Sequence, residues 1–305
     1  MSTAIILGSS GQDGILLGEL LSNKGYKVIG VGDSSEWDIT QPKRVRELIL
    51  SVKPSEIYHL AAIHHSSEES GSENSDFTRR TFEVNFHSLI HFLESIRNDS
   101  PKTRIFYAAS SHIFGHPSAA IQCESTPLRP DSSYAISKAN GLLACRKFRK
   151  KYGLFASVGI LYNHESNLRS EKFLSMKIIK TALAIRSGQQ DHLVIGDLNA
   201  TIDWGYAGDY VEAMYRILQL PTSDEFIVAT GEGHTVREFI QIVFDSLDLD
   251  PEKYVRQDPS ILTRRGPVRI GDPAKLIRQT GWKPMFKFEE MVKMLLKIES
   301  SKKAK

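Results

Sequence analysis

The sequence has few cysteines and no long apolar run. Cys123 and Cys145 are the only cysteines among 305 residues, so two reduced thiols are expected rather than a disulfide framework. No segment approaches the roughly 20 consecutive apolar residues that a membrane span needs. The N-terminal residues up to Gly8 lack a basic region and are typical of a strand rather than of a signal peptide. These absences predict a cytoplasmic protein with no membrane contact.

The sequence also has no marked excess of positive or negative charge. The formal net charge is +3, and the basic residues are spread along the chain rather than gathered into a stripe. This distribution gives no electrostatic support for nucleic-acid binding. The histidine pairs His64-His65 and His112/His116 have no acidic or cysteine partners at ligand spacing, so no metal site is expected.

What the sequence does contain is an alternation of apolar runs and amphipathic stretches. In the first half the runs are rich in β-branched and aromatic residues, which is typical of buried parallel strands with helices between them. The expected strands are Ala4–Leu7, Lys27–Val31, Glu56–Ala62, Arg104–Ser110 and Leu154–Leu161. The expected helices are Ile15–Lys24, Lys43–Val52, Thr81–Arg97 and Tyr134–Tyr152. We therefore predict an α/β fold with a Rossmann-type doubly wound parallel sheet.

The second half follows the same alternation less regularly. It is expected to form a smaller C-terminal α/β domain. We expect residues 1–162, joined by a returning segment at about 203–230, to form the first domain and residues 163–305 to form the second. The expected elements are helices Phe173–Ser187, Asp209–Leu220, Val236–Leu247 and Phe288–Ile298, and a strand at Glu225–Thr230.

A glycine motif directly follows the first strand and precedes the first helix. Gly8 permits a tight turn, Gly11 lets the backbone approach a pyrophosphate, and Gly14 lets the helix pack closely on the strand. The N-terminus of the helix then faces the phosphates. We also expect Ser10, Gln12 and Asp13 of this turn to contribute to cofactor binding.

Two acidic residues lie where the cofactor's ribose and adenine would be expected. Asp33 follows the second strand about twenty residues after the last glycine, where a carboxylate binds ribose hydroxyls. Because a carboxylate repels a 2′-phosphate, Asp33 favours NAD over NADP; the alternative interpretation is a solvated turn residue. Asp38 is a second candidate, on the adenine side.

A tyrosine and a lysine one helical turn apart form the candidate catalytic pair. Tyr134 and Lys138 share a helix face, and a neighbouring cation stabilises a phenolate. Such a pair can take a proton from a sugar hydroxyl while hydride leaves the same carbon. Ser110, at the end of the fourth strand, would hydrogen-bond that hydroxyl; the alternative is a simple turn or helix cap.

These residues resemble the extended short-chain dehydrogenase/reductases, and within them the GDP-mannose 4,6-dehydratases, over nearly the whole chain. The motifs that carry the resemblance include Gly11-Gln-Asp-Gly14, Glu56-Ile-Tyr-His-Leu-Ala-Ala62, Tyr134-Ala-Ile-Ser-Lys138, Asn163-His-Glu-Ser166, Asp203-Trp-Gly205 and Gly281-Trp-Lys-Pro284. The resemblance implies that C4 of a hexose is oxidised, that water is eliminated across C5 and C6, and that the hydride returns to C6.

The resemblance implies that residues 1–162, with the returning segment at about 203–230, bind the dinucleotide and that residues 163–305 form a substrate-binding domain for the nucleotide sugar. It also implies roles for individual residues. Ser110, Tyr134 and Lys138 would oxidise C4, while Asn163, Arg169 and Lys177 would face the diphosphate and nucleotide. Arginine suits phosphate by its bidentate geometry and lysine by its point charge; the alternative for these residues is a solvated basic face. Further expected contacts are Leu60, Ala61 and Ala62 with the cofactor, and His64, Ser111 and Arg264 with the substrate.

Three departures from the family pattern affect the expected chemistry. His112 stands where the family has a glutamate that handles the C5 proton and the departing C6 hydroxyl. Histidine also acts as acid and base near neutral pH; the alternative is a structural loop histidine. Ile202 replaces an arginine before Asp203-Trp-Gly. The arginine-containing segment that binds the 2′-phosphate of NADP and joins tetramers is replaced by a short stretch at Asp33.

The sequence therefore predicts an NAD(P)-dependent enzyme that oxidises C4 of a nucleotide-linked hexose or heptose, of the GDP-mannose 4,6-dehydratase type. The alternatives are a C4 dehydrogenase, epimerase or 4-keto reductase that eliminates no water, and a non-catalytic NAD-binding sensor. With the tetramer-forming insertion missing, we expect a homodimer built on helices Thr81–Arg97 and Tyr134–Tyr152.

Overall fold

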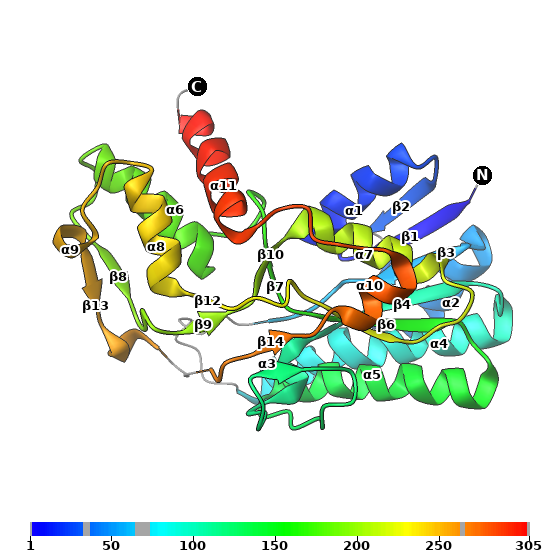
Figure 1. The fold of residues 1–305 in the computed structure, drawn as a ribbon. Helices are drawn as coiled ribbons and strands as arrows, with labels where there is room; N and C mark the ends of the chain where they lie inside the picture. The colour runs from blue at the N-terminus through cyan, green and yellow to red at the C-terminus, as the bar shows by residue number, and fades with distance from the viewer. Residues whose placement is uncertain (1, 33–36, 65–73, 263–265, 304–305) are drawn as a thin grey trace.

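A six-stranded parallel sheet forms the centre of the first half of the molecule (Figure 1). The computed structural model describes residues 2–32, 37–64, 74–262 and 266–303. The strands follow the order β11-β6-β4-β3-β1-β2, and all their pairings are parallel. Their bounds are β1 (Thr3–Leu7), β2 (Lys27–Val31), β3 (Glu56–His59), β4 (Arg104–Ser110), β6 (Ala156–Leu161) and β11 (Glu225–Val228). The predicted Rossmann-type sheet is confirmed.

Helices cover both faces of this sheet. Because both faces are covered, the inner strands are almost entirely buried, which explains their unbroken apolar runs. One face packs against α2 (Pro42–Val52), α3 (Ser75–Phe82), the π-helical segment η1 (Glu83–His87), α4 (Ser88–Asp99) and α5 (Ser133–Tyr152). The other packs against α1 (Gln12–Asn23), α7 (Ala207–Gln219) and α10 (Ala274–Thr280).

The order of the strands reverses beside β1. Its neighbours are β2 on one side and β3 on the other, so the connections that leave β1 and β3 diverge. In doubly wound sheets, ligands bind in the crevice at the carboxyl ends of the strands at such a point. The fold therefore places the glycine-rich turn after β1 at the expected ligand-binding edge.

The second half contributes short strand pairs and a separate apolar core. Its helices α6, α8 and α11 pack together around Met176, Phe239 and Leu295. The helices are α6 (Leu174–Arg186), α8 (Val236–Asp245), α9 (Pro251–Tyr254) and α11 (Phe288–Lys303). The strand pairs are β7 (Asn163–Glu165) with β10 (Trp204–Tyr206), β8 (Leu193–Ile195) with β13 (Val255–Gln257), β9 (Thr201–Ile202) with β12 (His234–Thr235), and β5 (Ile121–Gln122) with β14 (Ile270–Gly271). Short 3-10 turns complete the chain at η2 (Ser111–Phe114) and η3 (Pro259–Ile261).

Several predicted elements differ from the observed ones in their bounds, and the structure shows the cause of two of these differences. The expected strand Glu56–Ala62 ends at His59, because the backbone N–H and C=O of Ile63 bond the side chain of Asn85 instead of a neighbouring strand. The expected helix Thr81–Arg97 is part of a longer helical segment that starts at Ser75, where the side chain of Asn74 caps the N–H of Phe77.

No helix among the described residues is long and apolar enough to cross a membrane. Within the same part of the chain, no group of three or more His, Cys, Asp or Glu side chains is arranged to hold a metal ion.

Asp203 joins three segments that meet beside the sheet, and its side chain is 1% exposed. Oδ1 accepts from the backbone N–H and the hydroxyl of Thr230, at 2.9 and 2.7 Å. Oδ2 accepts from the N–H groups of Gly231 and Gly271, at 3.1 and 3.2 Å. The carboxylate therefore connects the end of β11 and the start of the last segment to β9–β10.

We predict that Asp203→Asn lowers the free energy of unfolding by about 2 kcal/mol, because an amide replaces one acceptor oxygen by a donor that faces N–H groups. Urea unfolding of the variant, with the exposed Asp191→Asn as a matched control, measures this loss. An effect no larger than that of the control would contradict the role assigned to Asp203.

Candidate active site

The glycine-rich turn after β1 has the shape of a diphosphate cradle. Gly8 has a φ of +84°, and a Cβ there would lie 2.8 Å from the backbone nitrogen of Ala61. A Cβ on Gly14 would lie 2.3 Å from the carbonyl oxygen of Gly8. At Gly11, by contrast, a Cβ would meet only that same oxygen, at 3.4 Å. Gly8 and Gly14 are therefore packed tightly against the protein backbone, while Gly11 has space beside it. This space lies directly before α1, where a pyrophosphate would fit.

The side chains of Gln12 and Asp13 are directed toward β7. Gln12 Nε2 donates to the carbonyl oxygen of His164 at 3.1 Å, and the hydroxyl of Ser166 donates to Gln12 Oε1 at 2.8 Å. Asp13 Oδ2 lies 2.9 Å from His164 Nε2. These contacts fasten the cofactor turn to the Asn163-His-Glu-Ser166 stretch. The N–H groups at the start of α1 remain available to the cofactor.

The chemistry of His164 favours its charged form. Nδ1 lies 2.7 Å from the carbonyl oxygen of Tyr162, which can only accept, so Nδ1 carries a proton. A neutral ring would then turn a lone pair toward the carboxylate of Asp13. Burial alone opposes the charge, but the Asp13 carboxylate outweighs it and raises the pKa of His164 above 6.5. Burial likewise opposes ionisation of Asp13, and His164 outweighs it and lowers the pKa of Asp13 below 3.8.

The other predicted cofactor residues lie around this turn. Ser10 is exposed, and its Oγ would lie 3.2 Å from a Cβ on Gly32. Leu60 continues from β3, its N–H bonded to the carbonyl of Leu7 at 3.0 Å, and Ala61 touches Gly8; Ala62 follows in the same irregular segment. Asp38 accepts from the N–H and hydroxyl of Thr40, so its carboxylate organises a turn. Asp33 lies outside the described residues.

Ser110 ends β4 and begins the turn η2. Its Oγ accepts from the N–H of His112 at 3.3 Å, so Ser110 forms the cap that was the alternative interpretation of this residue. A hydroxyl that accepts one hydrogen bond can still donate its proton to a substrate oxygen. Ser110 and Ser111 are both buried, and His112 is half-buried.

Tyr134 and Lys138 lie one turn apart in α5. The helix begins at this point because Ser132 caps the N–H of Ala135. Lys138 Nζ donates to the carbonyl of Ala108 at 2.8 Å and lies 5.8 Å from the centre of the Tyr134 ring. Burial lowers the pKa of Lys138 to about 7, and the attraction of Asp13 only partly opposes this. The ammonium is therefore placed beside the phenol in a nearly dry environment, where charges interact strongly.

Three aromatic rings from separate elements meet at Tyr134. The His64 ring is centred 4.4 Å from the Tyr134 ring, and the His112 ring lies 5.8 Å from Tyr134 and 5.9 Å from His64. His64 also stacks on Phe173, with centroids 6.2 Å apart and planes 12° apart. The guanidinium of Arg169 lies 3.7 Å from the centre of Phe173. The rings thus connect the candidate catalytic tyrosine to the candidate phosphate-binding arginine.

The remaining predicted substrate residues belong to the second half. Asn163 is exposed at the start of β7, opposite Trp204 of β10. Lys177 lies in the first turn of α6, four residues after Phe173. Arg169 Nε lies 3.5 Å from the buried carboxylate of Glu165, which partly neutralises it. Arg264 lies outside the described residues.

Asn85 is a structural member of the site that our sequence interpretation missed. Its side chain accepts from the N–H of Ile63 and donates to the carbonyl of Ile63 and to Ser137. Its carbonyl accepts from Tyr107 in the sheet. The π-helical geometry of η1 brings this residue into the interior. A lone asparagine among apolar residues of a predicted helix was the available signal.

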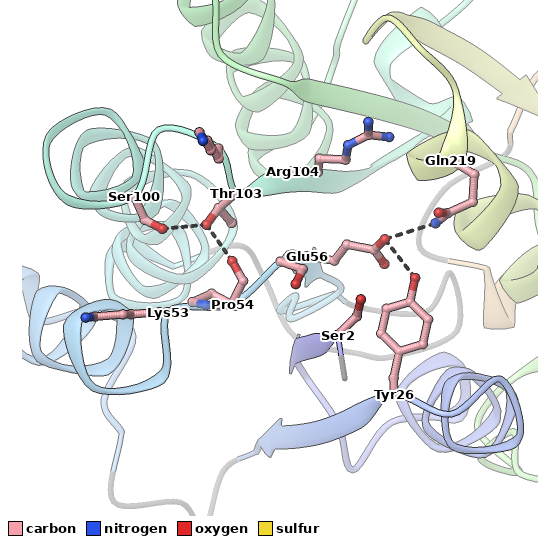
Figure 2. A pocket seen from close by; sticks show the side chains of 11 residues that line it. Ser2, Tyr26, Lys53, Pro54, Glu56, Ser100, Thr103, Arg104 and Gln219 are labelled. Carbon is pink, nitrogen blue, oxygen red and sulfur yellow. Dashed lines mark hydrogen bonds between the residues drawn. The ribbon is translucent and has the colours of Figure 1, made fainter.

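A cavity of about 520 Å³ lies at the opposite edge of the sheet, at the amino ends of β1, β3 and β4 (Figure 2). The carboxylate of Glu56 is held there by Tyr26 and Gln219 and also accepts from Tyr58. None of the predicted site residues lines this cavity. Its polar groups satisfy one another and stabilise the amino edge of the sheet.

We predict that the contact between Asp13 and His164 depends on pH. The stability due to the raised pKa of His164 is fully present below pH 6.5 and is lost as the pH rises through the raised value. The part due to the lowered pKa of Asp13 is present above pH 3.8 and is lost as the pH falls through the lowered value. The contact should therefore be strongest between about pH 4 and 6.5.

A double-mutant cycle with Asp13→Asn and His164→Gln measures this contact. We expect a coupling free energy of about 1.5–3 kcal/mol near pH 5.5, as for a buried hydrogen bond between charged groups, and a smaller value at pH 9. A coupling that does not change with pH would show that the pair is a neutral hydrogen bond.

Sequence comparison connects this site to known enzymes. The family model of GDP-mannose 4,6 dehydratase matches residues 34–295. GDP-mannose 4,6 dehydratase 2 of Arabidopsis thaliana is 37% identical over 96% of this chain and 85% of the relative. GDP-mannose 4,6-dehydratase of Yersinia enterocolitica is 31% identical over 95% of this chain and 92% of the relative.

Solved structures share the fold at lower identity. RMD from Pseudomonas aeruginosa, solved with NADPH, has a TM-score of 0.85 at 21% identity and covers 99% of this chain and 100% of its own. UDP-glucose 4-epimerase of Thermotoga maritima, solved with UDP-glucose, has a TM-score of 0.84 at 20% identity and covers 98% and 99%. These structures show the fold. The family match and the sequence relatives confirm the resemblance seen in the motifs and show that the chain belongs to the GDP-mannose 4,6-dehydratase family.

Proposed function

We propose that this protein is an NAD-dependent dehydratase that converts GDP-mannose into its 4-keto-6-deoxy product. The observation that carries the proposal is the position of Tyr134 one helical turn before Lys138, whose Nζ bonds the carbonyl of Ala108 near the carboxyl end of β4, two residues before Ser110. Family membership adds the substrate class, since its relatives are GDP-mannose 4,6-dehydratases. The intact tyrosine–lysine pair argues against a non-catalytic sensor.

Three residues of the chain take part in the first step, the oxidation of C4. Tyr134 takes the proton of the C4 hydroxyl, and the Lys138 ammonium stabilises the phenolate that this needs. Ser110 donates a hydrogen bond to the same oxygen and orients it. A dinucleotide held at the glycine-rich turn would supply the hydride chemistry of this reaction. We propose that His112, two residues beyond Ser110, acts on the proton of C5, which the C4 ketone makes acidic.

We infer that the two halves of the molecule bind different ligands. Residues 1–162 with the returning segment at about 203–230 bind the cofactor, and residues 163–305 bind the nucleotide sugar through Asn163, Arg169 and Lys177. Separate apolar cores in the two halves support this division. The Asp13–His164 contact then lies between the two binding functions.

A second candidate function stops before elimination, as a C4 dehydrogenase, epimerase or 4-keto reductase. The observation that favours it is His112, because an imidazole occupies the position of the glutamate that the family uses for elimination. These chemistries need only hydride transfer and, for an epimerase, a single acid–base group.

Incubation with a panel of nucleotide sugars and mass analysis of the products distinguishes these functions. We expect GDP-mannose to lose the mass of water. Loss of two hydrogens would instead indicate dehydrogenation, and an unchanged mass with altered NMR couplings would indicate epimerisation. Tyr134→Phe should slow turnover at least about 100-fold, because the phenol is the proton acceptor; Tyr152→Phe on the same helix serves as the control and should remain active.

We further propose that NAD(H) is preferred over NADP(H). A carboxylate at Asp33 would repel a 2′-phosphate, and relatives of the same fold have been solved with either cofactor. Titration of both cofactors into stripped protein should give tighter binding of NAD(H), and Asp33→Asn should narrow the difference. Tighter binding of NADP(H) by the wild-type protein would contradict this preference.

We also propose a homodimer that buries the outer faces of α4 and α5. Ile136 and Leu143 on α5 are 38% and 46% exposed, and Ile90 on α4 is half-buried. Light scattering at micromolar concentration should give the mass of two chains, and Leu143→Glu should give a monomer. Leu50→Glu on α2 is a matched control, because Leu50 is also 46% exposed. A wild-type monomer or tetramer would contradict the proposal.

A further inference from the structure

The cluster of His64, His112 and Tyr134 contains one more titratable ring than the proposed function uses. His64 follows β3, His112 belongs to η2 and Tyr134 to α5, so three elements separated in sequence bring these rings together. Both imidazoles lie within 6 Å of the Tyr134 ring, centre to centre, and His64 is the nearer at 4.4 Å. Imidazole is the side chain that gains and loses protons near neutral pH.

Contacts with neighbouring rings hold the position of His64. Its ring lies near Phe173 with nearly parallel planes, and the guanidinium of Arg169 lies against Phe173. The backbone next to it is fixed because Asn85 bonds both the N–H and the C=O of Ile63. Such fixed geometry is what a proton-transferring group requires.

His64 is close both to the group expected at C4 and to the side chain that carries the group expected at the diphosphate. Its ring is centred 4.4 Å from Tyr134 and 6.2 Å from Phe173, and the guanidinium of Arg169 lies against Phe173. A hexose bound between the arginine and the tyrosine would therefore lie close to His64. The same ring can contact the hexose while His112 approaches it from the turn after β4.

We propose that His64 is a second acid–base catalyst, which protonates the departing C6 hydroxyl while His112 removes the C5 proton. This inference rests on the proposed dehydratase function and adds a catalytic residue to it. Elimination needs a base and an acid at adjacent carbons, and the structure provides two imidazoles beside one reacting tyrosine.

The step is balanced within the 4-keto sugar and the two rings. The C5–H bond breaks, its proton goes to His112, and its electron pair forms the C5–C6 double bond. The C6–O bond breaks, and its electron pair goes to oxygen, which takes a proton from His64 and leaves as water. His112 later returns its proton to C5 when C6 is reduced. The proton that Tyr134 took from the C4 hydroxyl replaces, through solvent, the one that His64 gave up.

The test compares His64→Gln and His112→Gln with the control His192→Gln, an exposed histidine at the start of β8. Three quantities are measured with GDP-mannose: reduced cofactor formed in a single turnover, solvent deuterium incorporated at C5, and dehydrated product at saturating substrate. A second substrate carries fluoride in place of the 6-hydroxyl, because fluoride leaves with far less need of an acid.

We expect His64→Gln to form reduced cofactor and to exchange the C5 proton, yet to lose dehydrated product at least about 100-fold. The fluoride substrate should restore most of its elimination. His112→Gln should lose C5 exchange and elimination with both substrates, because the C5 proton must be removed in either case. The control should match the wild type.

A His64→Gln variant that dehydrates GDP-mannose normally at saturation, with only a raised KM, would overturn the proposal and make His64 a substrate contact. An equal loss with both substrates would overturn it as well. Cofactor binding confirms that each variant is folded, and His64→Asn replaces His64→Gln if the latter does not bind cofactor. Failure of the proposed function is seen separately, as absence of dehydrated product from the wild type.

Discussion

The contact between Asp13 and His164 joins the two parts of the molecule on which the site depends. Asp13 lies in the first turn of α1, directly after the glycine-rich turn, and His164 lies in β7, the first strand beyond the sheet. The carbonyl of Tyr162 fixes the proton on His164 Nδ1, so the other nitrogen must face the carboxylate. Gln12 and Ser166 form a second bond across the same gap. The glycine-rich turn, tied in this way, cannot shift without moving the strand that begins the second half.

At His164 a neighbouring carboxylate outweighs the effect of burial on the pKa, whereas at Lys138 burial dominates. The amino group of Lys138 donates to the carbonyl of Ala108, near the end of β4. Burial disfavours the charged form of this amine beside Tyr134 and lowers its pKa to about 7. A pKa shifted in this way is typical of groups in functional sites, whereas most lysines are exposed and stay charged.

The histidine at position 112 distinguishes this chain from the pattern that its family resemblance implies. The expected elimination base is a glutamate, whereas here the carboxyl edge of the sheet presents two imidazoles around Tyr134. A carboxylate acts mainly as a base at neutral pH, while a pair of imidazoles can divide the roles of acid and base. The replacement of the glutamate by histidine is therefore compatible with an elimination that uses different proton donors and acceptors, and equally with an enzyme that no longer eliminates water.

The sequence by itself determined the parallel sheet, the glycine-rich turn and the pairing of Tyr134 with Lys138. These features depend on local patterns: buried strands read as apolar runs, and residues four apart share a helix face. Only the tertiary structure determined which residues that are distant in the sequence lie next to one another. It brought Asp13 to His164, moved Asn85 inward through a π-helical turn, ended β3 early, and gathered His64, His112 and Phe173 around one tyrosine. Such neighbours come from loops at the carboxyl edge, whose paths are set by hydrogen bonds to distant residues rather than by their own periodicity.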